Sequence, residues 1–131
     1  MRRYILMLLL AVASSAAMGE WAKLMASQSE ANTIYADSAT IRRTGNKAKM
    51  WGLVDHQTAV TDSFGKSHVS ERVHREYDCK DEQERILAYV TYSENMGKGK
   101  TIYGDSGPGK WRPVAPDTAE KSLWKIACGK K

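Results

Sequence analysis

The chain has 131 residues, with 20 basic and 15 acidic side chains and a formal net charge of +5 at pH 7. This length predicts one small domain, and the mild positive charge does not indicate a nucleic-acid-binding protein. No run of about 20 apolar residues is present, which argues against a stable membrane span.

The first residues have the three parts of a secretory signal peptide. The first three residues include two arginines, Ile5–Ala13 is apolar, and small residues follow it. We expect cleavage after Gly19, or alternatively after Ala17, so that residues 1–19 are the signal peptide and residues 20–131 the mature domain. No cysteine stands at the expected cleavage point to carry a lipid, and the mature domain would have 112 residues and a net charge of +3.

Most of the mature sequence predicts short strands joined by turns, which favours antiparallel pairing. The expected strands are Trp21–Met25 at an edge, Asn32–Ala36, Ser38–Arg43 after a short turn, Lys47–Gln57, Val69–Cys79, Glu84–Ser93 and Thr101–Tyr103.

Alternation along these segments indicates which faces are buried. In the strand that begins at Lys47, the side chains of Lys49 and Trp51 share one face, while Met50 and its alternate neighbours share the other. A polar loop is expected over Thr58–Ser67. Glu84–Ser93 carries apolar residues on both faces, which predicts a central strand.

The end of the chain predicts a helix over Asp117–Cys128. Asp117 with Glu120 fits a capping box, and Thr118 is an alternative cap. An apolar stripe runs along the segment, and Gly129 is suited to end it. The expected architecture is therefore an α+β fold, in which one antiparallel sheet has a C-terminal helix packed on it.

Cys79 and Cys128 are the two cysteines of the chain. In the oxidising compartment that export implies, an isolated pair predicts one disulfide. A nucleophilic role would need a free thiol, and a metal site would need further ligands nearby. Closing a loop of about 50 residues contributes on the order of 4 kcal/mol in the chain-entropy estimate.

Several motifs imitate known catalytic or nucleotide sites without their full patterns. Residues 104–110 match the body of a phosphate-binding loop, but Trp111 replaces the Ser or Thr that would hold magnesium. The GDSG within these residues matches the serine-nucleophile signature of a class of proteases. Those enzymes assemble their catalytic triad between two β-barrels, which this chain is too short to form. His56, His68 and His74 have no metal-ligand spacing, so a zinc site would need distant parts of the chain.

We therefore predict no catalytic residues, no metal and no cofactor. A small hydrolase remains an alternative if the fold places His56 or His74 in a cleft against a carboxylate and a hydroxyl.

A basic and aromatic segment is the candidate partner-binding site. Lysines beside aromatic residues on loops can bind proteins or acidic polymers. The alternative is a solvated lysine-rich surface with Trp111 packed beneath the helix. The candidate residues are Lys98, Lys100, Tyr103, Lys110, Trp111 and Arg112.

Six segments, in this order and spacing, resemble the surface-adhesin protein E-like family of small exported bacterial domains. They are YADSATIRRTGNKAKMWGLVD (35–55), YDC (77–79), ERILAYVTYSE (84–94), MGKGKTIY (96–103), WRPVAP (111–116) and TAEKSLWKIAC (118–128).

The resemblance implies a single antiparallel sheet with a packed C-terminal helix and a Cys79–Cys128 bridge. It also implies adhesion, because the founding member of the family binds host extracellular-matrix proteins, and dimerisation, which its relatives can show. No catalytic residue is implied. The founding member is lipid-anchored, whereas no lipidation cysteine is found here.

The sequence thus predicts an exported, non-enzymatic binding module of the bacterial envelope, periplasmic or outer, whose partner is a protein or an envelope polymer. The alternative is a structural protein of the periplasm that forms a homodimer through an exposed strand edge.

Overall fold

The computed structural model describes residues 25–131, and describes burial from Ser29 onward. The predicted signal peptide and most of the strand predicted at Trp21–Met25 lie outside these residues. The elements are β1 (Met25–Gln28), β2 (Asn32–Thr44), β3 (Lys47–Thr61), β4 (Ser67–Asp78), β5 (Gln83–Tyr92), the 3-10 turn η1 (Asn95–Gly97), β6 (Thr101–Ser106), β7 (Arg112–Pro113) and α3 (Ala119–Cys128).

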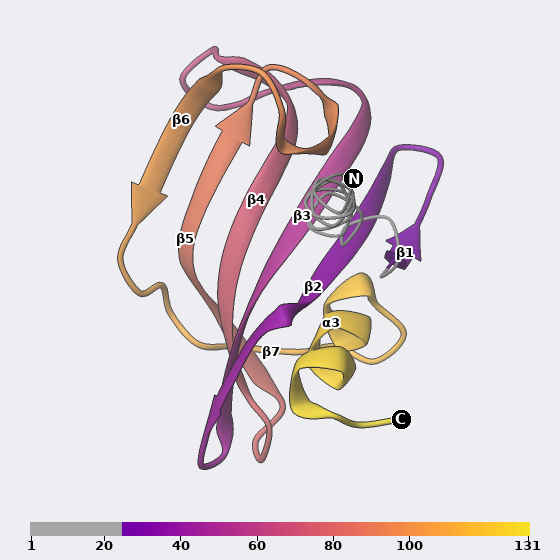
Figure 1. Cartoon of the computed structure of the whole chain (residues 1–131), viewed down its shortest axis with the longest axis vertical. Coiled ribbons are helices and arrows are strands. Elements are labelled where there is room, and N and C mark those ends of the chain that lie inside the picture. Colours follow the sequence, from indigo (N-terminus) through magenta and orange to yellow (C-terminus); the bar gives the residue numbers. More distant parts are fainter. Residues whose placement is uncertain (1–24) are drawn as a thin grey trace, which may run out of the picture.

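The predicted α+β architecture is confirmed. Strands β1 to β6 lie side by side in chain order, and β7 pairs with β5. Every pair is antiparallel, as the short connections predict. Helix α3 packs on β1 to β4 near one end of this sheet (Figure 1). Within residues 25–131, no helix is long and apolar enough to cross a membrane.

The two strands predicted at Asn32–Ala36 and Ser38–Arg43 are one strand with a bulge. Asp37 pairs with Trp51 and Arg42 with Lys49, so residues 38–41 stand opposite one residue of β3. The Thr40 hydroxyl donates to the Asp37 carbonyl and accepts from the Trp51 backbone N–H. This side chain replaces the lost ladder bonds, and the strand bends instead of ending.

The polar loop predicted over Thr58–Ser67 is shorter than expected, because β3 continues to Thr61. The turn is closed by the Asp62 side chain, whose Oδ1 accepts from the backbone N–H groups of Phe64 and Lys66 at 2.9 Å. A single carboxylate thus closes a five-residue turn, and the flanking polar residues remain free to pair as strands.

The prediction that β5 is a central strand is confirmed, but the prediction that it is buried on both faces is wrong. It has neighbours on both sides, β4 on one and β6 with β7 on the other, but most of its side chains are only half-buried. The reason is the position of α3, whose main contacts are with β1 to β4.

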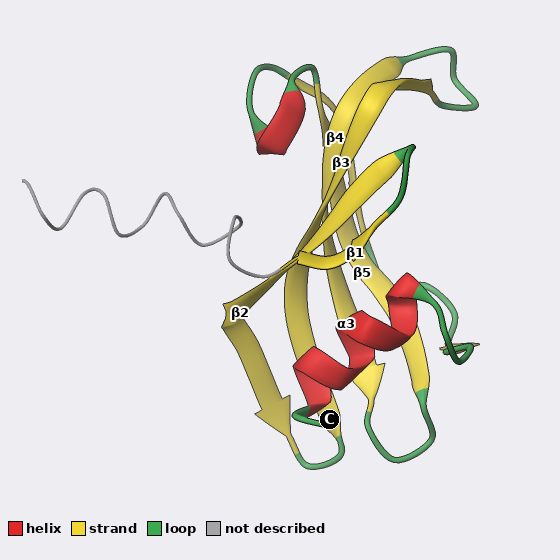
Figure 2. Ribbon diagram, turned by 90° about the vertical axis from the view of Figure 1, so that its right-hand side faces the viewer, coloured by secondary structure: helices red, strands yellow, loops and turns green. Residues whose placement is uncertain are grey.

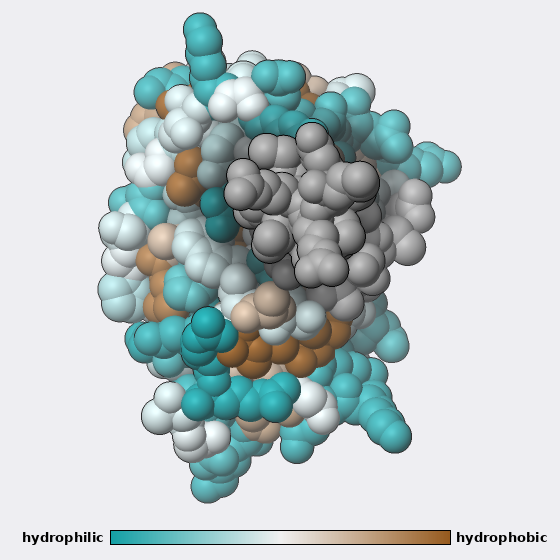
Figure 3. Space-filling model, viewed as in Figure 1, coloured by the Kyte–Doolittle hydropathy of each residue, from teal (hydrophilic) through white to brown (hydrophobic). Residues whose placement is uncertain are grey.

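The core lies between α3 and the strands beneath it. Figure 3, viewed as Figure 1, shows an apolar band beside the position of α3 and smaller apolar patches elsewhere on a mostly hydrophilic surface. The buried residues of the core are Ala36, Ala48, Met50, Tyr77, Val114, Leu123, Trp124 and Ala127.

Both ends of α3 are fixed by specific bonds. Thr118 is the N-cap, and its hydroxyl accepts from the Lys121 N–H at 3.2 Å, so the alternative cap is the correct one. Asp117 instead adopts a positive φ of 60° before the helix. Gly129 ends the helix in the left-handed conformation, as predicted.

The predicted disulfide joins the last turn of α3 to the end of β4. The Cα atoms of Cys79 and Cys128 are 5.6 Å apart, and both cysteines pack against the core. Beside them, Trp124 Nε1 donates to the Asp78 carbonyl at 2.9 Å. Arg43 Nε donates to the Ala127 carbonyl, also at 2.9 Å. The helix is therefore tied to both β2 and β4.

Replacing Cys79 or Cys128 with Ser should lower the free energy of unfolding by about 2–5 kcal/mol, because the bridge constrains 49 residues of chain in the unfolded state. Urea unfolding under oxidising conditions measures this change. The matched control is the wild-type protein in reducing buffer, which should unfold like the two variants. Equal stability of oxidised wild type and variants would contradict a stabilising bridge.

Candidate interaction surface

The sheet has two faces with different cover. Figure 2 shows α3 on one side of the sheet and η1 on the other. Ala48 and Met50 of β3 point into the core under α3, so Lys47, Lys49 and Trp51 project to the opposite side, which we call the open face. The alternation predicted from the sequence for this strand is confirmed.

One end of the open face is closed by the segment around η1. Ser70 Oγ donates to the Glu94 carbonyl and accepts from the Gly97 N–H. Gly97 lies over Leu53, which is fully buried, and a Cβ at Gly97 would be 3.5 Å from that side chain. Asp55 Oδ1 accepts from the Met96 N–H at 2.8 Å. The rest of the open face has no such cover among the described residues.

The middle of the open face holds a stacked aromatic and cationic group. The rings of Trp51 and His74 are 4.6 Å apart and nearly parallel, with an interplanar angle of 6°. The Arg72 guanidinium lies 4.7 Å from the centre of the Trp51 ring. Burial and the nearby Lys49 ammonium lower the pKa of His74 below its ordinary value of 6.5, while Glu76 opposes them. His74 is therefore neutral at pH 7, which suits its stacking beside two cations.

Trp111 is the second tryptophan of the open face and lies near the C-terminal end of β4. The Arg85 guanidinium lies 4.6 Å and the Lys47 ammonium 5.7 Å from the centre of the Trp111 ring. Arg85 also donates to Glu76 Oε1 through Nε and Nη2. Lys47 pairs with Asp78 at 3.2 Å. These paired cations hold Trp111 in a defined position on the open face.

A basic hollow lies next to the two tryptophans. Its volume is about 360 Å³, and it is lined by Arg42, Thr44, Lys47, Lys49 and Glu76. The one carboxylate among these residues is already bonded to Arg85. Arg42 and Lys49 are exposed and cationic, so the hollow offers positive charge to a carboxylate of a partner.

The six residues of the predicted partner site do not form one patch. Tyr103 pairs with Thr91 and Arg112 with Glu84, so they lie at opposite ends of β5, about 23 Å apart along the strand. Arg112 Nη2 bonds to Glu84, which is buried at the edge of a hollow near the start of α3.

The other members of the predicted site are also dispersed. Lys98 and Lys100 are exposed in the connection before β6, and Lys110 is exposed in the segment before β7. Tyr103 lies beside Tyr89 and Phe64. Trp111 is not packed beneath the helix, because its contacts with Arg85 and Lys47 place it on the open face.

The open face contains residues that the predicted partner site does not include. These residues are Arg42, Lys49, Trp51, Arg72 and Arg85. The signal was present in the alternation of β3, where lysines share a face with a tryptophan, but only strand pairing brings the arginines of the neighbouring strands beside them.

The hydrolase alternative requires His56 or His74 in a cleft against a carboxylate and a hydroxyl. His56 lines a hollow with Thr33 and Asp55, but Asp55 Oδ1 there accepts from Asn95 and from the Met96 N–H. His68 bonds to Glu71 through Nε2, but its Nδ1 is buried without a hydrogen-bond partner in the described part of the chain. His74 stacks on Trp51. Neither ring activates a hydroxyl in this arrangement.

Comparison with known proteins identifies the family. The family described as surface-adhesin protein E matches residues 21–129. The chain belongs to this family. No curated protein matches the chain.

Solved structures of protein E from Haemophilus influenzae share its fold. One crystal form matches with a TM-score of 0.60 at 17% identity, covering 73% of this chain and 80% of that one. A second structure gives a TM-score of 0.58 at 18% identity, with 73% and 76% covered. Protein E from a non-typeable strain gives 0.56 at 18% identity, with 73% and 69% covered. At these identities the likeness shows a common fold.

The titration of His74 tests the electrostatics of the open face. We expect Lys49→Gln to raise the pKa of His74, because it removes a cation that disfavours the imidazolium. The pKa is read from the imidazole proton resonances by NMR. Lys125→Gln, an exposed change on α3, is the control and should leave the pKa unchanged.

The lowered pKa of His74 also predicts how the stability of the protein changes with pH. Since the folded state holds this proton less readily than the unfolded chain, stability should fall as the pH decreases through 6.5. His74→Asn should reduce that loss. An identical pH dependence in wild type and variant would contradict the lowered pKa.

Proposed function

We propose that this member of the protein E family is an exported, adhesin-like binding module that holds an extracellular or envelope protein on its open face. The observation that carries the proposal is the basic hollow beside Trp51 and Trp111 on a face that α3 leaves uncovered. Family membership supports adhesion as the type of function.

The chemistry of the open face favours a protein segment with acidic side chains. Tryptophan and arginine dominate the energetics of protein interfaces because they offer large apolar area together with directed hydrogen bonds. Here the cations already stacked on the rings hold both tryptophans in place, so binding would cost little ordering entropy. Carboxylates of the partner would enter the hollow beside Arg42 and Lys49.

The proposal includes a non-enzymatic role and a location outside the cytoplasm. The disulfide supports export, because such bonds persist in oxidising compartments. We place the protein in the periplasm or the outer envelope after cleavage at residue 19. Partner recognition then needs only a preformed surface and no cofactor.

A paired charge reversal tests the proposed surface. The change Arg42→Glu with Lys49→Glu should weaken binding to extracellular-matrix proteins about tenfold or more, and added salt should weaken wild-type binding. Biolayer interferometry against a panel of purified, immobilised matrix proteins measures both effects.

The matched control is Lys98→Glu with Lys100→Glu. It changes the net charge equally, but at exposed positions beyond β5, far from the hollow. This variant should bind like wild type. Equal losses in both double variants would show that only net charge matters, and a panel without any binder would contradict the adhesin-like function.

The homodimer predicted as an alternative has one structural feature in its favour. Strand β6 is an edge of the sheet and is paired only with β5 among the described residues. The lower part of β5 is covered by residues 107–113 through bonds to Leu87 and Ile86, so on this side of the sheet a second copy would add at β6. Sedimentation equilibrium at micromolar concentration distinguishes a stable dimer from a monomer.

A further inference from the structure

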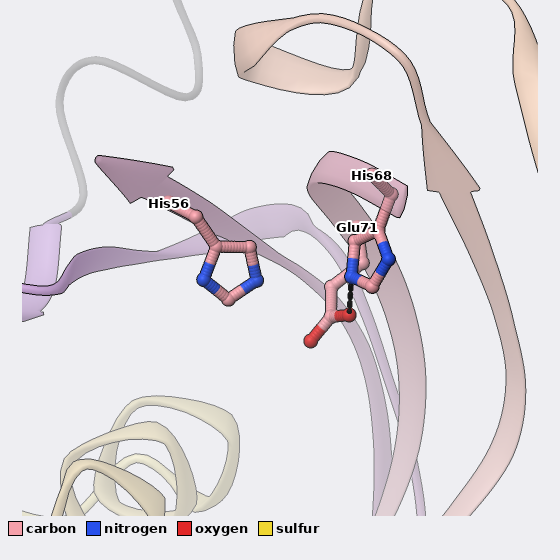
Figure 4. A group of neighbouring side chains, drawn as sticks. All are labelled: His56, His68 and Glu71. Carbon is pink, nitrogen blue, oxygen red and sulfur yellow. Dashed lines mark hydrogen bonds and ion pairs between the residues drawn. The ribbon is translucent and has the colours of Figure 1, made fainter. Parts of the chain in front are cut away.

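Three side chains with metal-binding chemistry gather at the end of the β3–β4 hairpin. His56 comes from β3, and His68 and Glu71 come from β4 (Figure 4). One nitrogen or carboxylate oxygen from each residue lies within 4.8 Å of those from the other two. The two imidazole rings have centroids 5.6 Å apart at an angle of 70°.

A bulge in β3 creates this cluster. Asp55 pairs with Ser70 and Val60 with His68, so residues 56–59 stand opposite Val69 alone. Extra residues in a bulge bend the strand and redirect its side chains. The sequence does not predict this cluster, because a hairpin with regular register would not bring His56 and His68 together.

The nitrogens of the cluster are not satisfied by the protein itself. His56 Nε2 is buried and has no hydrogen-bond partner within residues 29–131. Figure 4 shows that a ring nitrogen of His56 points toward the other two side chains. His68 is only 5% exposed, and its Nε2 makes one bond, of 3.1 Å, to Glu71 Oε2. Buried polar atoms without partners are rare and indicate a missing ligand or water.

Two imidazoles and one carboxylate are a donor set that Zn²⁺ uses in sites with an open fourth position. Bound donors lie about 2.0–2.2 Å from zinc, which puts neighbouring ligand atoms about 3.4 Å apart in a tetrahedral site. Nε2 of His68 and Oε2 of Glu71 are already at 3.1 Å. The remaining gap, at most 4.8 Å, can close by rotation of His56 and Glu71, which are only partly buried.

We propose that His56, His68 and Glu71 bind a divalent transition-metal ion, with Zn²⁺ as the expected occupant. The ion would satisfy the unpaired nitrogen of His56 and join the ends of β3 and β4. The side chain of Glu71 is 28% exposed, so the fourth position is reached from solvent and takes water or a donor from outside the chain. The cluster lies at the opposite end of β3 from the basic hollow, so it is separate from the proposed interaction surface.

Isothermal titration calorimetry with zinc chloride tests the site on the disulfide-bonded protein, purified without a histidine tag. We expect one zinc ion per chain, and we expect His56→Gln and Glu71→Gln each to weaken binding at least about tenfold, because each removes one donor. His74→Gln is the matched control, since it removes a partly buried histidine outside the cluster and should bind zinc like wild type.

Two further measurements guard against a folding artefact. Circular dichroism checks that the two variants keep the sheet, which we expect because both side chains are partly exposed. In the wild type, zinc should raise the melting temperature in a concentration-dependent way, and this rise should be lost in Glu71→Gln. Absence of saturable binding, or equal zinc affinity in wild type and both variants, would overturn the proposal.

Discussion

The attachment of α3 to the end of β4 is the constraint on which the rest of the structure depends. The Cys79–Cys128 bridge fixes the last turn of the helix, and Trp124 bonds to the Asp78 carbonyl beside it. Residues 25–131 contain one α-helix, and this attachment places it on one face of the sheet. The core forms there, and in the described part of the chain the other face is covered at one end by η1 and is otherwise open.

The open face is stabilised by its own side chains. Trp51 stacks on His74 and contacts the Arg72 guanidinium, and Trp111 is covered by Arg85 and Lys47. Cations on aromatic rings keep their charged groups in water while they shield apolar surface. The same stacking leaves a charged and aromatic surface available to a partner. The contacts that shield the apolar area of a single-layer sheet therefore also suit that sheet to binding.

Local pattern predicted most of the strands, the helix stop at Gly129 and the bridge, because alternation, capping residues and a single cysteine pair are short-range signals. The bulges at Thr40 and after Asp55 could not be predicted, since they depend on how two strands pair. For the same reason the partner-site prediction grouped residues that are near in sequence but lie at opposite ends of β5. The alternation of Lys49 and Trp51 was visible, but its neighbours on β4 and β5 were not.

The tryptophan indole signals in a ¹H–¹⁵N NMR spectrum test most directly whether the uncovered face is where the protein binds. Trp51 and Trp111 lie on that face, whereas Trp124 belongs to α3 and is buried in the core on the other face. During titration with a glutamate-rich peptide, we expect the indole signals of Trp51 and Trp111 to move while that of Trp124 stays fixed. Movement confined to Trp124, or to backbone amides of residues 98–103, would contradict the account.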